Sequence, residues 1–173
     1  MSRWPIITVG KVRVAGMALA ALAATASPAR AACPIELATY GQSETGARVE
    51  FSPAPKNAAV TNTFRLLLGN DVLLDGIVMW TEGVSRPNGL LTYQCPLGDV
   101  TGEEYEACTV WQGVIYTSDR SGTIGLLPSE GKEAPELLVL PDLGPSVQAA
   151  PALAAHELQD VPWDVFSKDG CQE

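Results

Sequence analysis

Histidine is nearly absent from this chain, which has a single one, His156, among its 173 residues. Functions that need two histidines, such as histidine-rich metal centres, are therefore excluded. The sequence also contains no G-x-S-x-G nucleophile elbow, no glycine-rich phosphate loop and no C-x-x-C-H haem motif. These absences argue against serine hydrolases with that elbow, P-loop nucleotide binding and covalent haem attachment.

The segment that begins at His156 matches the H-E-x-x-H zinc helix only at its first two positions. Asp160 stands where that motif has its second histidine. Residues four apart share one face of a helix, which is why the full motif chelates zinc. Because the second histidine is missing, we expect no metal and no cofactor. We expect His156 to be a surface residue of a helix or loop.

Basic residues are scarce, with 11 Lys and Arg against 20 Asp and Glu, for a net charge of −9. Four of the eleven lie in residues 1–31, so residues 32–173 carry seven basic and twenty acidic side chains, a net charge of −13. Such a balance disfavours nucleic acid and anionic membranes as partners. The usual explanation of such a charge is a surface that keeps the protein soluble. The more specific hypothesis is that the charge attracts a basic partner or divalent cations.

The first 31 residues have the three parts of a secretory signal. Lys11 and Arg13 end a basic segment, Val14–Ala26 is an apolar run, and Ala29 and Ala31 supply small residues before the cut. This order is typical of a cleaved signal peptide. We therefore expect cleavage after Ala31 and a periplasmic or secreted protein of residues 32–173.

Two other interpretations of this segment are weaker. An uncleaved membrane anchor would need about 20 apolar residues, and this run is shorter and stops at Ser27-Pro28. Acylation of Cys33, as in a lipoprotein, would need a branched aliphatic residue where Arg30 stands. We therefore expect no stable membrane insertion after cleavage.

All four cysteines follow the predicted signal, which in an exported protein indicates two disulfides. We favour Cys95–Cys108 as a short loop clamp and Cys33–Cys171 as a link between the two ends. The main alternative pairs Cys33 with Cys95 and Cys108 with Cys171. In the loop-closure model each bond stabilises the fold by about 3–5 kcal/mol.

Short strands separated by turns every 8–12 residues predict an all-β fold, a small disulfide-stabilised sandwich or barrel. Within Val60–Leu68, residues Thr63 and Arg65 should face outward while Phe64 and Leu66 face the core. In the fourth strand, Asp75-Gly76 is expected to mark a bulge. The predicted strands are Ile35–Tyr40, Arg48–Phe51, Val60–Leu68, Val72–Thr81, Leu90–Cys95, Cys108–Thr117, Thr123–Leu127 and Pro135–Leu140.

The C-terminal segment differs in composition from the predicted strands. Residues 141–151 are rich in proline, glycine and alanine, and residues 151–159 form either a short helix or an irregular loop. We expect one β-rich domain over 32–173, with its core at about 33–140. Residues 141–173 are then a short helical or irregular segment that docks on the core.

The candidate contact residues lie in two places, an acidic loop between Cys95 and Cys108 and the aromatic Trp163. We expect the loop residues to be solvated and available to a partner, whereas Trp80 and Trp111 should pack within the strands. Residues 161–166 should dock on the core, and exposure of Trp163 as an aromatic contact is the alternative. Weak calcium binding by the loop is an alternative, although the order of its acids is not that of an EF-hand. The candidate contact residues are Asp99, Glu103, Glu104, Tyr105, Glu106 and Trp163.

The sequence thus predicts an exported, non-enzymatic binding or interaction module with no catalytic residues. Its partner would be an unknown protein or small ligand of the cell envelope. The alternatives are a small periplasmic hydrolase that uses His156 or an acid, and a calcium-stabilised domain that uses the 99–106 loop.

Overall fold

A computed structural model describes residues 32–56, 59–69, 72–80, 86–99 and 101–173. The predicted secretory signal at 1–31 and Thr81, the end of the fourth predicted strand, lie outside the described residues. Within them the fold is mostly β, as the sequence predicts. The strands are β1 (Ala38–Gly41), β2 (Arg48–Ser52), β3 (Asn62–Leu67), β4 (Leu73–Met79), β5 (Asn88–Thr92), β6 (Thr109–Val114), β7 (Tyr116–Ser118), β8 (Ile124–Leu126), β9 (Leu137–Val139) and β10 (Val165–Cys171). The helices are α1 (Gly102–Cys108), α2 (Leu143–Ala149) and the 3₁₀ turns η1 (Ile35–Leu37) and η2 (Pro151–Leu153).

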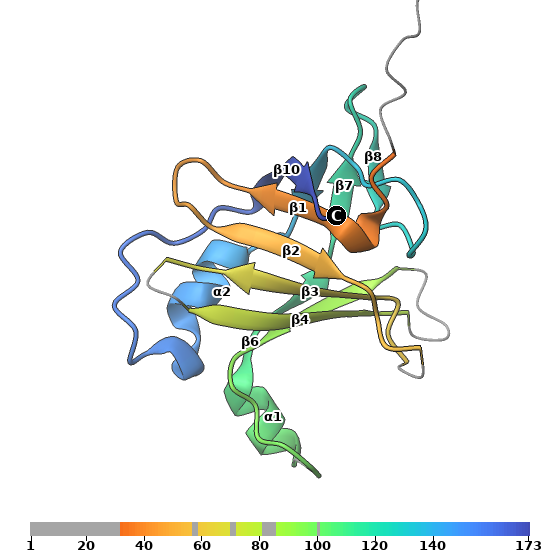
Figure 1. Cartoon of the computed structure of the whole chain (residues 1–173). Helices are drawn as coiled ribbons and strands as arrows, with labels where there is room; N and C mark the ends of the chain where they lie inside the picture. The colour runs from red at the N-terminus through yellow and green to blue at the C-terminus, as the bar shows by residue number, and fades with distance from the viewer. Residues whose placement is uncertain (1–31, 57–58, 70–71, 81–85, 100) are drawn as a thin grey trace, which may run out of the picture. The chain divides into compact units, whose positions relative to one another are not determined.

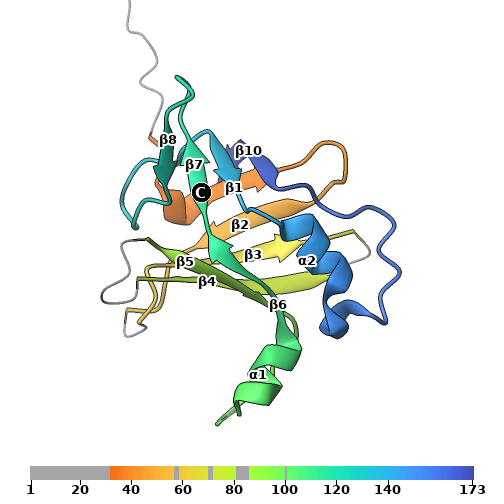
Figure 2. The ribbon, with the colours of Figure 1, turned by 180° about the vertical axis from the view of Figure 1, so that it is seen from behind.

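These ten strands form one antiparallel sheet in the order β6-β5-β4-β3-β2-β1-β10-β9-β7-β8. The predicted strand at Cys108–Thr117 is divided between α1, β6 and β7, and only Ile115 separates the last two. Since β6 lies at one end of the sheet and β7 near the other, this nearly continuous segment joins the two ends. The sheet therefore curls into a nearly closed barrel or sandwich (Figures 1 and 2).

Side chains alternate between the inner and outer faces of the strands, and those on the inner face form the core. β3 shows the alternation predicted from its sequence. Phe64 and Leu66 are buried and Arg65 is exposed. The ring of Phe64 packs on that of Phe51 of β2 at 5.4 Å between centroids, and Phe51 meets Tyr40 of β1 at 6.0 Å. Three adjacent strands thus share one aromatic cluster on their inner face.

The expected bulge at Asp75-Gly76 is wrong. β4 keeps a regular register with both neighbours, and Gly76 pairs with Phe64 on β3 and with Leu91 on β5. A Cβ atom at Gly76 would lie 2.5 Å from the Phe64 ring. Glycine is therefore present because the aromatic ring covers this position, not because the strand bends.

The C-terminal segment is more ordered than the sequence indicates. α2 forms within the proline- and alanine-rich stretch, η2 is the only part of 151–159 that is helical, and β10 enters the sheet between β1 and β9. Phe166 of β10 is fully buried. The pattern that predicts a docked segment missed this interior strand because Val165 and Phe166 are its only large apolar residues.

Both disulfides follow the pairing favoured from the sequence. Cys33 is bonded to Cys171 at the end of β10, and Cys95 is bonded to Cys108 at the end of α1. The first bond ties the start of the described chain to its last strand. The second closes the loop that carries α1.

The contact between Gly76 and Phe64 makes a stability prediction. Gly76→Ala should lower the free energy of unfolding by about 1–3 kcal/mol, because the added methyl group must displace a ring in a packed core. Urea denaturation of the purified protein measures this change. Gly69→Ala is the matched control, since a Cβ there meets nothing within 4 Å. Equal stability of the two variants would contradict the assigned role of Gly76.

Candidate functional site

A groove of about 680 Å³ is lined by residues of β1, the β1–β2 turn (residues 42–47) and β10, together with Arg48 and Trp163. We call it the Trp163 groove. Its volume is within the range of about 300–1,000 Å³ that is usual for ligand sites. The side chains that give it its chemistry are those of Gln42, Glu44, Arg48, Trp163, Ser167 and Asp169.

The Gln42 side chain fixes one wall of the groove. Its Nε2 donates to the carbonyl oxygen of Val165 at 2.9 Å and also to that of Trp163, while its Oε1 accepts from the Trp163 N–H at 2.9 Å. Thr45 Oγ1 donates to the same Oε1 at 2.9 Å. The amide thereby pairs with the backbone of 163–165 much as a neighbouring strand would.

The indole of Trp163 is open to solvent although its backbone is fixed. The side chain is 70 % exposed, the most exposed aromatic among the described residues. The next residue, Asp164, accepts hydrogen bonds from the backbone N–H groups of Asp142 and Leu143, at the start of α2. A large apolar group is therefore presented on a backbone held from both sides, so little ordering is required when a ligand binds.

The Asp169 carboxylate lies in the groove beside a β-bulge. Exposed and more buried positions alternate along β10, so Asp169 shares the outer face of the sheet with Ser167. Thr39 pairs with Gly170 and Tyr40 with Lys168, which leaves Asp169 without an opposite residue on β1. The Thr39 hydroxyl donates to Asp169 Oδ1 at 2.7 Å.

Two glycines make room for this pair. A Cβ atom at Gly41 would lie 2.7 Å from Asp169 Oδ2, and one at Gly170 would lie 2.7 Å from Thr39 Oγ1. The Asp169 carboxylate thus lies against the backbone of β1, where a larger residue at position 41 would displace it. Both positions are strand glycines at which another group approaches closely.

The charges of the groove are unequal. Glu44 and Asp169 are acidic, and Arg48 is the only basic residue of its lining. The Arg48 guanidinium lies 3.9 Å from the Glu50 carboxylate, and both side chains are partly exposed. Such a pair contributes little to stability, but it partly offsets the positive charge at this side of the groove.

The acidic loop predicted between Cys95 and Cys108 is partly helical. Its last residues form α1, and Glu104 and Thr101 make a capping box in which the Glu104 carboxylate accepts from the Thr101 N–H at 2.9 Å. These hydrogen bonds lower the pKa of Glu104. Glu104 therefore serves the helix, although it is exposed to solvent like Asp99, Glu103 and Glu106.

We call residues 94–107 the acidic arm, apart from Val100, which is outside the described residues. Leu97 is fully exposed on it, and Tyr105 is about two-fifths exposed. α1 contacts η2, and both views show it at the opposite end of the sheet from the β1–β2 turn (Figures 1 and 2). The structure therefore does not bring the acidic arm and Trp163 together, and they are two separate surfaces.

His156 belongs to neither surface. Its Nε2 lies 2.8 Å from the Tyr93 hydroxyl, the two rings meet edge to face at 5.2 Å, and Gln94 Nε2 donates to the same hydroxyl.

Of the two tryptophans expected to pack, Trp111 is buried and its Nε1 donates to the Pro141 carbonyl, whereas Trp80 is 46 % exposed. The expectation for Trp80 is wrong because it lies one residue beyond the end of β4.

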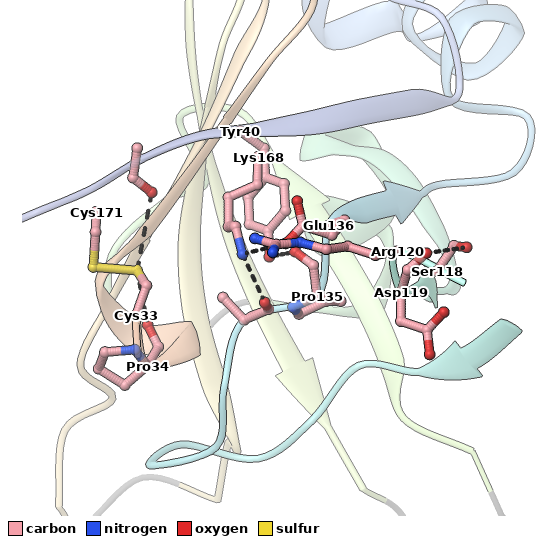
Figure 3. Close-up of polar contacts among 12 residues, drawn as sticks. Cys33, Pro34, Tyr40, Ser118, Asp119, Arg120, Pro135, Glu136, Lys168 and Cys171 are labelled. Carbon is pink, nitrogen blue, oxygen red and sulfur yellow. Dashed lines mark hydrogen bonds and ion pairs between the residues drawn. A yellow bond between two sulfur atoms is a disulfide. The ribbon is translucent and has the colours of Figure 1, made fainter. Parts of the chain in front are cut away.

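A second polar cluster lies on the inner side of β10. Lys168 Nζ and Arg120 Nε each lie 3.0 Å from Glu136 Oε1, and Figure 3 shows them approaching it from two sides. The hydrogen bond from Lys168, followed by that from Arg120, holds the pKa of Glu136 below its ordinary value. The Tyr40 hydroxyl donates to the Pro135 carbonyl at 3.0 Å, and burial, with the nearby Glu136, raises the pKa of Tyr40. This cluster ties β10 to the segment before β9.

In the described part of the chain, no group of three or more His, Cys, Asp or Glu residues is arranged to hold a metal ion. None of the described helices is both long and apolar enough to cross a membrane.

No protein-family model, curated protein or solved structure matches the chain. The Trp163 groove is thus identified by its geometry alone, and sequence reasoning found one of its members, Trp163. It missed Gln42 and Asp169, whose roles depend on contacts with distant parts of the chain.

The Glu136 cluster makes stability depend on pH. Because the pKa of Glu136 is lower in the folded state than its ordinary value of 4.5, its ion pairs stabilise the fold above that pH. This contribution is lost as the pH falls through the lower, folded-state pKa. We therefore expect Glu136→Gln to reduce the acid-induced fall in thermal stability between pH 6 and pH 2.5.

Thermal melts across this pH range measure the effect. Glu103→Gln removes the same charge from an exposed position of α1 and controls for the change in net charge. A Glu136→Gln profile that parallels the profile of the unsubstituted protein would contradict the role given to the cluster.

Proposed function

We propose that this chain is an exported, non-enzymatic binding module and that the Trp163 groove is its contact surface. The observation that carries the proposal is the exposed indole of Trp163 on a backbone fixed by Gln42, in a groove that also holds the Asp169 carboxylate. Exposed tryptophans in preformed surroundings are frequent hot spots of binding. The partner is a protein or small ligand of the cell envelope.

Export is part of this proposal and rests on two supports. The first 31 residues have the order of a cleaved secretory signal, with the cut after Ala31. Two disulfides, Cys33–Cys171 and Cys95–Cys108, are consistent with a non-cytoplasmic location, since such bonds persist in oxidising compartments. On these grounds the protein acts in the periplasm or outside the cell.

The acidic arm is a second contact region of the same module. Its disulfide holds the loop closed, and Leu97, Tyr105 and the exposed acids Asp99, Glu103 and Glu106 are open to solvent. The arm and the groove lie apart, so one partner would have to be large to reach both. We therefore assign the main contact to the groove, where the side chains are fixed by hydrogen bonds.

A binding function agrees better with the groove than the hydrolase alternative does. A hydrolase of the expected kind needs a base beside an acid in a cleft. His156 is hydrogen-bonded to Tyr93 and is not part of the groove lining. Asp169 is held in place by the hydrogen bond from Thr39, and no histidine lies in the groove to act with it as a base.

The test compares capture of envelope components by the immobilised protein and by two variants. Trp163→Ala should deplete the species captured by the unsubstituted protein about tenfold or more, because truncation of a central tryptophan removes most of the contact energy. Trp80→Ala is the matched control, since Trp80 is also exposed but lies outside the groove. Quantitative mass spectrometry of the captured species gives the ratio.

Undiminished capture by Trp163→Ala would overturn the assignment of the groove. Equal losses in Trp163→Ala and Trp80→Ala would also overturn it, because they would indicate a general effect of exposed aromatic area.

A further inference from the structure

We infer that the Trp163 groove binds a cationic side chain, above all an arginine, in an extended basic segment of a partner protein. This inference rests on the proposed function, and it adds the chemical class of the ligand. It is argued from the acceptor groups of the groove, from its exposed indole and from the charge of the chain.

The fixed polar groups of the groove call for a hydrogen-bond donor. Asp169 Oδ1 accepts from Thr39, and its Oδ2 lies against the backbone at Gly41. An ionised carboxylate accepts hydrogen bonds and donates none, and its two oxygens have more acceptor sites than the one that Thr39 uses. Glu44, at the β1–β2 turn, is a second exposed acceptor of this kind. A ligand that fits these groups is rich in N–H donors.

The lining selects a flat cation among such donors. A tryptophan face attracts a guanidinium or an ammonium group, and a guanidinium also stacks on an aromatic ring and pairs with carboxylates through its N–H groups. Trp163 and Asp169 both line the groove. This lining therefore fits arginine better than lysine, and lysine better than an uncharged side chain.

Arg48 does not reverse this preference. Its guanidinium lies 3.9 Å from the Glu50 carboxylate, and neither Glu44 nor Asp169 forms an ion pair within the described residues. Residues 32–173 carry twenty acidic against seven basic side chains, so the whole chain attracts cations and repels anions. The local and long-range charges thus favour the same ligand.

The size of the groove favours a peptide segment over a free amine. A volume of about 680 Å³ is several times that of a guanidinium group, which leaves space for the residues on either side of the arginine. Ser167 and the backbone at Gly41 and Gly170 line this space. The Ser167 hydroxyl and the Asp169 carboxylate can accept hydrogen bonds from the main-chain amides of an extended segment.

The experiment is an NMR titration of the isotope-labelled protein with three probes of equal length. They are triarginine amide, tricitrulline amide, which has the shape of arginine without its charge, and N,N′,N″-triacetylchitotriose (chitotriose below) as a neutral polyol. We expect triarginine to bind with a single saturable site and to shift the indole N–H signal of Trp163. The signal of Trp111, whose Nε1 is bonded to Pro141, should stay unchanged.

Three variants locate the site. Trp163→Ala and Asp169→Asn should each weaken triarginine binding about fivefold to tenfold, and Glu44→Gln by a smaller factor. Glu103→Gln on α1 changes the net charge by the same amount and should leave affinity within twofold. Glu44→Gln keeps the test valid if Asp169→Asn fails to fold, because the exposed Glu44 side chain forms no hydrogen bond with the other described residues.

Equal weakening by Glu103→Gln and by the groove variants would overturn the inference, because it would show diffuse attraction to the acidic surface. Binding of tricitrulline or chitotriose in preference to triarginine would overturn it too. If triarginine fails to bind while capture of envelope components still depends on Trp163, only the cationic class is wrong. If that capture is also independent of Trp163, the proposed function itself is wrong.

Discussion

The pairing of β10 with β1 on one side and β9 on the other is the interaction on which the rest of this structure depends. It joins the β1–β6 part of the sheet to the β7–β9 part, so the sheet curls as one. Alternate residues of the strand serve opposite faces. Phe166 and Lys168 complete the core and the Glu136 cluster, while Ser167 and Asp169 form the groove. The Cys33–Cys171 bond then anchors the end of this strand to the start of the described domain.

The position of β10 explains how a solvent-exposed groove can still be rigid. Exposed sites are usually carried by loops, which lose conformational entropy on binding. Here Trp163 precedes an interior strand directly, and Gln42 fixes its backbone to the β1–β2 turn. The bulge at Asp169 interrupts the β1–β10 pairing at one residue only, and the Thr39 hydroxyl compensates for it. In the proposed function, ligand binding would therefore require little reordering of the groove.

Much of the sheet could be predicted from local patterns, because strands such as β3 alternate between apolar and polar residues over their whole length. The pairing of Cys95 with Cys108 followed from their short spacing. β10 could not be predicted in this way, since Ser167, Lys168 and Asp169 resemble a surface segment in sequence. The groove depends on Gln42 and Trp163, which lie 121 residues apart, and no local pattern contains that contact. The sequence names Trp163 as a candidate contact residue, but its apolar neighbours favour a docked segment, and nothing in the sequence separates Trp163 from the acidic arm.

The most direct test of this account is native-state hydrogen exchange of the β10 backbone. The Lys168 amide donates to the Glu136 carbonyl at 2.9 Å, in a strand with neighbours on both sides. If β10 is integral to the sheet, its interior amides should exchange only through global unfolding, with the same opening free energy as those of β3. Exchange of the Lys168 amide at the far faster rates of a frayed chain end, while β3 stays protected, would show that β10 is a peripheral segment and would contradict the account.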